Sequence, residues 1–415
     1  MDKRERGHRL RGSRQPPSDK GKGVRFAGID IAAEKHFVAV VDERGDVLVK
    51  PTGFAEDAGG YEKVLELLGA PGDLLVAMEA TGHYWRNLFV ALAAAGHCVA
   101  LLNPLRTSRF ASEDLQRTKT DAIDAVGIAR FAAQKRPVAT RLPDSATQEL
   151  RELVRLRDRL MQDLCDRVRQ LHRAVDLGFP EFTRHVRTLD SELATAILHE
   201  YPTAEAFLGL PWKRLAKLCY DGRHKVGEEI AKALVEAAKV SVGRHHGPAY
   251  RVQVRFACED IDLLRRRLRD LDRDIERTLG DHEVGTLLTT IDGVGPTTAA
   301  RLIAELGDIS AFRNAAAVAA YVGVVPGLRQ SGKRQTTRAG LAPHGNARLR
   351  AKLWMPTLTA VRKNAWLRAY YEGLRARGKL PKVALVAAMR KLLIAVHYVA
   401  TNRKPFMPIL AEARA

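Results

Sequence analysis

Cysteine is scarce in this sequence of 415 residues and is scattered where it occurs. The four cysteines are Cys98, Cys165, Cys219 and Cys258, and no two of them form a CxxC pair. Disulfide-rich domains and zinc knuckles need closely spaced cysteines. The spacing therefore argues against both, and predicts thiols that are buried or without a special role.

Long uninterrupted apolar runs are also missing. The stretch 88–102 is too short to cross a bilayer, and the stretch 383–400 is interrupted by Arg390, Lys391 and His397. The N-terminal segment is polar and basic, without the apolar core of a signal peptide. We therefore expect a cytoplasmic protein with no membrane partner.

Acidic residues are nearly absent from the last quarter of the chain. The whole sequence has 68 Lys and Arg against 48 Asp and Glu, a formal net charge of +20. From Phe312 to Ala415, 20 Lys and Arg face only two acids, Glu372 and Glu412, so this segment carries +18. Each cation that meets a phosphate releases a counterion, which favours binding at moderate salt. The segment predicts a nucleic-acid partner, with an acidic membrane surface as the weaker alternative.

The pattern of apolar residues divides the chain into a tail and three domains. Residues 1–24 are basic and rich in Gly, Pro and Ser, which predicts a disordered tail. Residues 25–145 alternate short apolar strands with helices, which is typical of an α/β domain. We expect strands at 26–32, 37–41, 47–49, 74–79 and 98–102, and helices at 61–68, 85–95 and 120–133.

Two long amphipathic helices are predicted within residues 146–284. Apolar residues recur at steps of three and four from Leu153 to Val175 and from Ile261 to Ile275. The two helices could pair as an antiparallel hairpin or with a second subunit, and the heptad seam is compatible with both. Residues 176–250 between them are mostly helical in pattern and carry no recognisable chemistry. Residues 285–415 predict a mainly α domain.

Four acidic residues of the first domain occupy positions from which their carboxylates can meet. Asp30 lies inside an apolar strand, where an unpaired charge is costly, and Glu79 ends another strand. Asp121 and Asp124 share one face of a helix. Such a cluster repels itself unless it binds a divalent cation, and Mg²⁺ prefers oxygen ligands. Taken singly, each acid is equally compatible with local hydrogen bonding.

A glycine-containing turn opens the last domain. The segment 291–300, IDGVGPTTAA, resembles the hairpin of a helix-hairpin-helix motif. Gly293, Gly295 and Thr297 would then present backbone N–H groups at the start of a helix, where a DNA phosphate can bind. A plain turn that packs two helices together is the alternative.

A single serine stands in the basic segment. Ser331 is the only serine between Ala311 and the end of the chain. A serine hydroxyl can attack a phosphodiester when a base or metal takes its proton and cations hold the phosphate. A simple phosphate contact is the alternative role for Ser331. The predicted nucleic-acid contacts in this segment are Arg329, Lys333, Arg334, Arg338, Arg348 and Arg350.

Six blocks of the sequence together resemble one known family. GIDIAAEKHFVAVVD, MEATGHYW and KTDAIDA stand in the first domain, in that order. TIDGVGPTTAARLIAELGD, AYVGVVPGLRQSGK and GNARLR stand in the last. In this order the blocks resemble the bridge-RNA-guided DEDD transposases of the IS110 group of insertion sequences.

The resemblance implies a fold and a set of site residues. The fold would be a RuvC-like, RNase H-type α/β domain at 25–145, a helical coiled-coil region at 146–284, and a mainly α domain with a helix-hairpin-helix at 285–415. The metal-binding tetrad would hold Mg²⁺ or Mn²⁺, and Ser331 would form a covalent phosphoserine link to DNA. That tetrad would be Asp30, Glu79, Asp121 and Asp124.

The resemblance also implies partners. A noncoding bridge RNA would pair with the DNA of the element ends and with the target DNA. The protein would act as a dimer or tetramer, in which the metal domain of one subunit meets the serine of another. These partners would place the protein at the bacterial nucleoid, within the cytoplasm.

Three other readings of the sequence remain open. A RuvC-like junction nuclease would need the carboxylates but not Ser331. A tyrosine recombinase could use Tyr370, Tyr371 or Tyr398, but would not need the carboxylate domain. A non-catalytic nucleic-acid-binding protein would keep the basic segment and tolerate loss of Asp30.

Overall fold

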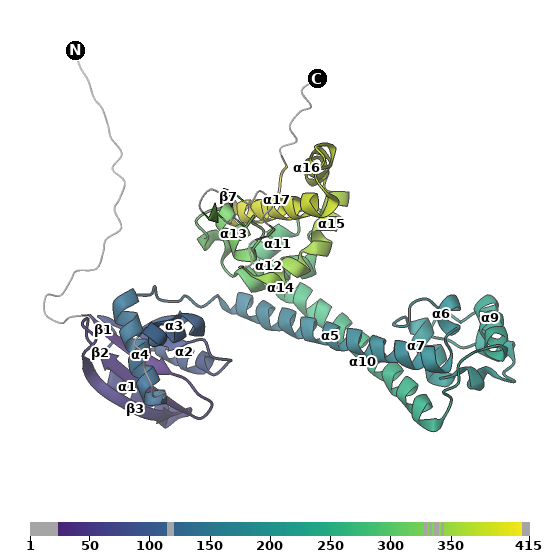
Figure 1. The fold of residues 1–415 in the computed structure, drawn as a ribbon, viewed down its shortest axis with the longest axis horizontal. Coiled ribbons are helices and arrows are strands. Elements are labelled where there is room, and N and C mark those ends of the chain that lie inside the picture. The colour runs from purple at the N-terminus through teal and green to yellow at the C-terminus, as the bar shows by residue number, and fades with distance from the viewer. Residues whose placement is uncertain are drawn as a thin grey trace, which may run out of the picture. The chain divides into compact units, whose positions relative to one another are not determined.

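The computed structural model describes residues 24–113, 120–327, 330–331, 334–335, 340–341 and 344–408 (Figure 1). The chain divides into two compact units, residues 1–142 and residues 143–415. The predicted basic tail lies outside the described residues up to residue 23. The second unit contains both the predicted helical middle and the predicted C-terminal domain.

A five-stranded sheet forms the centre of the first unit. Its order is β3-β2-β1-β4-β5, with β1, β4 and β5 parallel and β2 antiparallel to its neighbours. All five predicted strands are confirmed, and this mixed sheet is consistent with an RNase H-like domain. The strands are β1 (Arg25–Asp30), β2 (Lys35–Val41), β3 (Val47–Ala55), β4 (Leu74–Glu79) and β5 (Cys98–Leu102).

Helices cover both faces of this sheet. Because successive side chains of a strand point to opposite faces, Ala27 and Ile29 pack with α1 and α2, whereas Phe26 packs with α4. The three predicted helices are confirmed; α3 was not predicted, because its arginine-containing sequence has no apolar repeat. The helices are α1 (Ala58–Leu68), α2 (Trp85–Ala94), α3 (Pro104–Glu113) and α4 (Asp121–Lys135).

Two long helices run through the second unit and connect its two lobes. They are α5 (Ser145–Gly178) and α10 (Pro248–Gly280), which lie side by side in Figure 1. Ion pairs between Arg157 and Asp272 at 2.5 Å, and between Arg167 and Asp260 at 3.0 Å, fix their direction as antiparallel. The two helices therefore pair within one chain.

A small helical lobe lies at one end of this hairpin (Figure 1). Phe179, Phe182 and Phe207 form an aromatic centre there, and all three are fully buried. The segment between the two long helices therefore builds a packed core together with the adjoining ends of α5 and α10. Its elements are α6 (Phe182–His185), α7 (Glu192–Glu200), η1 (Ala204–Phe207), α8 (Trp212–Ala216) and α9 (Glu228–Lys239).

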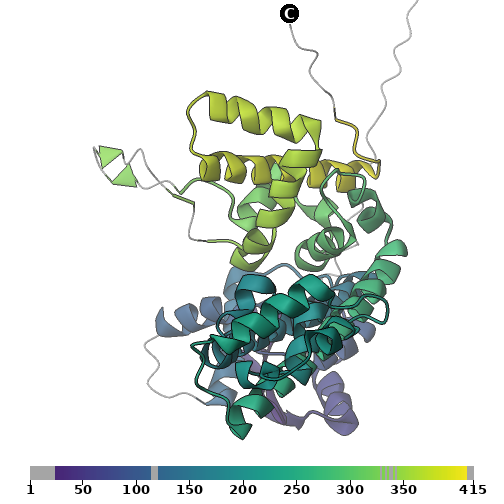
Figure 2. The same ribbon diagram turned by 90° about the vertical axis from the view of Figure 1, so that its right-hand side faces the viewer.

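A larger C-terminal lobe packs on the other end of the hairpin. Its core includes Leu150 and Val154 of α5 together with Leu271 and Ile275 of α10. A two-stranded antiparallel pair projects from its helices as two short green arrows in Figure 2. The elements are α11 (Glu283–Leu288), α12 (Pro296–Leu306), η2 (Ile309–Ala311), α13 (Ala315–Val322), β6 (Gln330–Ser331), β7 (Arg334–Gln335), α14 (Ala347–Lys352), α15 (Trp354–Lys363), α16 (Ala365–Ala376) and α17 (Pro381–Asn402).

The helix α17 is the only one in the described parts of the chain that is long and apolar enough to span a membrane. Its buried residues, among them Ala388, Leu392 and Val396, pack into the core of the C-terminal lobe. Just over half of its apolar window, 56%, is buried in this way. A core helix explains its composition, so the helix is weak evidence for a membrane span.

Candidate carboxylate site and serine hairpin

Asp30 and Glu79 stand at the same edge of the sheet. Asp30 ends β1 and Glu79 ends β4, and these two strands are parallel neighbours. Their register pairs Ile29 with Met78, so the two acids follow at equivalent positions. Because parallel strands end at a common edge, both carboxylates reach the same side of the domain.

A close crossing of α4 over β1 brings the other two acids to this edge. Gly28 makes the crossing possible, because a Cβ there would lie 2.2 Å from the Ala125 carbonyl oxygen and 2.3 Å from the Ala129 nitrogen. Thr120 caps the helix by accepting the N–H of Ile123. The first turn of α4 carries Asp121 and Asp124 at the positive end of the helix dipole, which favours negative charge.

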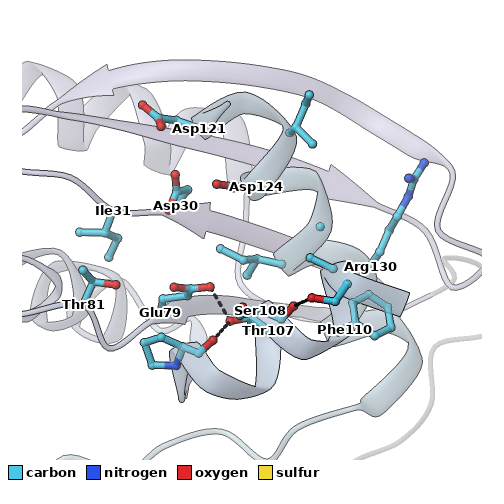
Figure 3. A pocket seen from close by; sticks show the side chains of 16 residues that line it. Asp30, Ile31, Glu79, Thr81, Thr107, Ser108, Phe110, Asp121, Asp124 and Arg130 are labelled. Carbon is cyan, nitrogen blue, oxygen red and sulfur yellow. Dashed lines mark hydrogen bonds between the residues drawn. The ribbon is translucent and has the colours of Figure 1, made fainter. Parts of the chain in front are cut away.

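All four predicted carboxylates line one pocket of about 570 Å³. Figure 3 shows Asp30, Glu79, Asp121 and Asp124 around this space. The edge of the sheet thus brings together acids that are far apart in the sequence.

The pocket changes the acidity of Asp30. Burial raises the pKa of this carboxyl, and the negative charges of Asp124, Asp121 and Glu79 raise it further. A hydrogen bond from the backbone N–H of Ile31 works in the opposite direction. The resulting pKa is about 6. A carboxylate in this setting is stabilised by a cation, which would offset both burial and repulsion.

The donors fit a hard divalent cation by chemistry. The pocket supplies carboxylate oxygens, which are the ligands that Mg²⁺ and Mn²⁺ prefer. Within the described residues, no three carboxylate, imidazole or thiol groups close around a single point. The four acids therefore line one space without forming a closed set of three ligands among the described residues.

Thr107 is a pocket residue that the sequence did not indicate. Its hydroxyl lies 2.5 Å from Oε1 of Glu79 and 3.0 Å from the Pro104 carbonyl oxygen, and the side chain is buried. A hydroxyl has one hydrogen, and the shorter distance favours donation to Glu79. Thr107 lies on α3, the helix that has no apolar repeat, so only the fold brings it to the site.

The predicted helix-hairpin-helix glycines have two different environments. A Cβ on Gly293 would lie 2.4 Å from Cα of Ala360, and the φ of Gly293 is +94°. This glycine therefore lets α15 pack against the turn between α11 and α12. Gly295 is exposed at the N-terminus of α12 with open space around it, and Thr297 is half-buried in the first turn. Binding of a phosphate there stays a prediction.

Ser331 lies in the two-stranded pair of the C-terminal lobe. Its backbone is part of β6 and pairs with Arg334 of β7. The side chains of these two residues are not described. The predicted contacts Arg329, Lys333 and Arg338 lie outside the described residues.

The base of this serine hairpin, residues 323–345, is closely packed. Gly323 and Gly345 have φ values of +81° and +117°, and a Cβ on Gly345 would lie 2.6 Å from Cα of Gly323. Further out, the Gly327 N–H donates to the Gly340 carbonyl at 2.8 Å. Arg350, predicted to contact nucleic acid, donates to the Val322 carbonyl at 3.1 Å and therefore holds this base.

Arg348 has acidic neighbours in the C-terminal lobe. Its guanidinium lies 3.6 Å from Asp158 and 3.5 Å from Glu305, and 47% of its side chain is exposed. Lys352 also approaches Asp158, at 3.1 Å. Both cations are therefore held near the surface beside the serine hairpin, and a phosphate contact by Arg348 stays a prediction.

Two family models match the chain in the regions that carry these features. A DEDD transposase model for IS110 elements matches residues 27–180, which include the carboxylate pocket. A model described as the IS116/IS110/IS902 transposase family matches residues 285–372, which include the serine hairpin. Together they cover more than half of the chain. The chain belongs to this family of insertion-sequence transposases.

Relatives of this transposase are similar along most of their length. A 44.8 kDa protein of insertion element IS116 from Streptomyces clavuligerus is 27% identical over 392 residues, 92% of this chain and 96% of the relative. A putative transposase for the IS117 mini-circle of Streptomyces coelicolor is 28% identical, covering 92% and 95%. A pilin gene-inverting protein from Moraxella bovis is 24% identical, covering 80% and 82%.

The two family models match the sheet domain and much of the C-terminal lobe, but not most of the small helical lobe. The pocket acids Asp30, Glu79, Asp121 and Asp124 fall within the first match, and Ser331 falls within the second. The small lobe around Phe207 lies between the two matches. Membership of a transposase family implies DNA as a partner, in agreement with the charge of the last segment.

Proposed function

We propose that this transposase cuts and rejoins DNA at the ends of its insertion sequence, using the carboxylate pocket and Ser331. The observation that carries the proposal is the convergence of Asp30, Glu79, Asp121 and Asp124 on one pocket. The raised pKa of Asp30 supports it, because a group disfavoured as a free carboxylate gains most from a bound cation.

The pocket acids would hold Mg²⁺, or Mn²⁺ in its place. A bound divalent cation polarises a scissile phosphate and stabilises negative charge on its oxygens. Asp30 binds a cation as the carboxylate, so a proton and a cation compete for this side chain. Thr107 orients Glu79 through the 2.5 Å hydrogen bond, and Asp121 and Asp124 lie at the positive end of the α4 dipole, which favours negative charge.

Ser331 would act as the nucleophile. Its hydroxyl oxygen forms a bond to phosphorus, the bond from phosphorus to the departing strand breaks, and the strand leaves as a free hydroxyl. The serine proton passes to a base, and a proton is taken up by the departing oxygen. Reversal with a different strand hydroxyl rejoins the DNA without an external energy source.

The partners follow from charge and from the family. The +18 of residues 312–415 would supply much of the affinity for the DNA of element ends and target, with a steep loss as salt rises. A noncoding bridge RNA would select the DNA by base pairing. A dimer or tetramer would bring the carboxylate pocket of one subunit to the serine of another.

A hydrolytic RuvC-like nuclease is the second candidate. It is favoured by one observation, that all the described residues that line the carboxylate pocket belong to the first unit. Water would then replace Ser331 as the nucleophile. A non-catalytic nucleic-acid-binding protein would need neither the pocket nor the serine.

A covalent protein–DNA product distinguishes these functions. The full chain is incubated with RNA from the flanks of its element, Mg²⁺ and labelled DNA that carries the element ends. Denaturing gels compare wild type with Ser331→Ala and Asp30→Ala. Ser310→Ala, in an exposed serine of the same lobe, and Asp73→Asn, in an exposed acid of the sheet domain, are the matched controls.

We expect a covalent band in wild type and in both controls, and none in Ser331→Ala or Asp30→Ala. Cleaved DNA that survives Ser331→Ala without a covalent band would identify the hydrolytic nuclease. Binding without cleavage, unchanged by Asp30→Ala, would identify the non-catalytic protein. Omission of the RNA tests its role in the same assay.

A further inference from the structure

A buried histidine lies directly behind the loop that follows Asp30. His36 of β2 is fully buried, and no step of the proposed reaction uses it. Its Nδ1 accepts the backbone N–H of Ala32 at 3.2 Å. Its Nε2 lies 2.7 Å from Oε2 of Glu56. Because Nδ1 accepts a hydrogen bond, the proton of the neutral ring is on Nε2, which donates to Glu56.

Glu56 joins this histidine to two helices. It follows β3, and its Oε1 accepts the hydroxyl of Tyr61 on α1 at 2.7 Å and the amide of Asn87 on α2 at 3.3 Å. The helix α2 begins at Trp85, shortly after the loop that leaves Glu79. Glu56 therefore links His36, which holds the loop after Asp30, to the first turn of α2, the helix that follows Glu79.

The contact at Ala32 bears directly on Asp30. The loop between β1 and β2 runs only from Ile31 to Glu34. Its first residue, Ile31, follows Asp30 directly, and its second, Ala32, is held by His36 through the backbone N–H. A shift at Ala32 would therefore move the backbone that carries Asp30, two residues before it.

We propose that His36, oriented by Glu56, is a positioning residue that holds the loop after Asp30 in the geometry needed to bind a divalent cation. The inference rests on the proposed function, in which Asp30 is a metal ligand. Partners behind a ligand fix its orientation, and their loss typically lowers metal affinity by about 10- to 100-fold. A histidine that only fills the core would affect stability, but not metal affinity at constant fold.

The two ring nitrogens can be replaced one at a time. In His36→Asn the side-chain oxygen stands in the place of Nδ1 and can still accept from Ala32. In His36→Gln the side-chain nitrogen stands in the place of Nε2, so the Glu56 contact can persist while the Ala32 contact is lost. Both variants remove the ring, and Gln keeps one methylene more than Asn, so a pure packing defect would be larger in His36→Asn, opposite to the order expected for metal affinity.

The test measures Mn²⁺ binding to the full chain by the paramagnetic resonance of free Mn²⁺, at pH 7.5. We expect His36→Gln to weaken binding by about tenfold and His36→Asn to stay close to wild type. Hydrogen exchange of the peptide that contains residues 31–35 should be faster in His36→Gln alone. Thermal unfolding without metal is recorded for each variant, with Tyr61→Phe as a control that leaves the Ala32 contact intact.

Equal Mn²⁺ affinity in His36→Gln and wild type would overturn the inference. A parallel loss of affinity and stability in both His36 variants would also overturn it, because the ring would then be a packing element. A wild-type protein that binds no Mn²⁺ would instead overturn the metal site itself. In that case the exchange at residues 31–35 still decides whether His36 holds the loop.

Discussion

Arg301 and Asp158 form an almost buried ion pair that joins α12 to the long helix α5. Two guanidinium nitrogens lie 2.9 Å from the two carboxylate oxygens, and the side chains are 8% and 12% exposed. Burial alone would raise the pKa of Asp158, but hydrogen bonds and charge from Arg301 and Lys352 outweigh it and lower the pKa. The pair ties the lobe that carries Ser331 to the hairpin of long helices.

Loss of Arg301 should destabilise the second unit. In Arg301→Met a nearly buried carboxylate loses its main partner, which typically costs about 3 kcal/mol of unfolding free energy. The double variant Asp158→Leu/Arg301→Met should recover most of that loss, because no nearly buried charge is left without a partner and the other cations near Asp158, Arg348 and Lys352, are partly exposed. Urea unfolding of the three proteins measures this. A single variant as stable as wild type would mean that Lys352 and Arg348 can neutralise Asp158 without Arg301.

The pH dependence of Asp30 has a definite sign. Its pKa is about 6 in the folded protein against an ordinary 3.8, so the folded state disfavours the ionised form. Without divalent metal, this carboxyl therefore lowers stability as pH rises from about 4 through about 6.

Asp30→Asn removes that charge and should stabilise the protein in EDTA at pH 8. We expect about 1 kcal/mol, less than the full pKa shift implies, because solvent screens a half-exposed carboxylate. The gain should shrink toward pH 4, whereas the exposed control Asp73→Asn should change little. Thermal unfolding at the two pH values decides this. A destabilised Asp30→Asn at pH 8 would show that the pocket favours the free carboxylate.

Thr107 should matter for metal binding through its hydroxyl alone. Thr107→Val keeps the shape of the side chain but leaves Glu79 without its 2.5 Å hydrogen bond. We expect about tenfold weaker Mn²⁺ binding and a matching rise in the Mg²⁺ needed for DNA cleavage. Thr107→Ser keeps the hydroxyl and should resemble wild type. If both variants bind Mn²⁺ equally well, Thr107 does not orient Glu79.

Gly293 and Gly295 should respond differently to alanine. A Cβ on Gly293 meets the backbone of Ala360 in a positive-φ conformation, so Gly293→Ala should lower unfolding free energy by about 2 kcal/mol or more. Gly295 has open space and a φ of −81°, so Gly295→Ala should fold normally. DNA affinity of Gly295→Ala then tests the predicted phosphate contact without a change in stability. Unaltered affinity at low salt would exclude a contact that requires close approach to this glycine.

The sequence predicted the sheet of the first unit well because its strands are short apolar runs separated by turn residues. The position of Glu79 at a strand end followed from those runs, whereas Asp30 was predicted inside a strand and is instead the last residue of β1, because the loop to β2 begins at Ile31. Thr107 could not be predicted, because it reaches the pocket through α3, whose sequence has no apolar period. The role of Gly293 in packing against Ala360 could not be predicted either. A glycine required for close helix packing and a glycine that binds a phosphate through its backbone N–H have the same local sequence pattern.

The second unit was less predictable for another reason. The apolar steps around Leu164 and Leu268 indicated two long helices, but a heptad seam does not say whether its partner is in the same chain. Arg350 lies in a basic segment, which suggested a phosphate contact. Arg350 instead donates to the Val322 carbonyl, because Gly345 packs against Gly323 and so brings the start of α14 next to the end of α13. This contact between residues distant in the sequence leaves no signal in the local sequence pattern.

Because Gly323 and Gly345 lie against each other, the serine hairpin begins and ends at the same place on the C-terminal lobe. The hairpin could therefore be deleted and its two ends joined by one or two residues without moving the helices of the lobe. The serine hairpin can therefore differ in length and sequence without a change in the packing of the C-terminal lobe. Hairpins of different lengths inserted between Gly323 and Gly345 would change the distance from Ser331 to the lobe and leave the helices of the lobe in place.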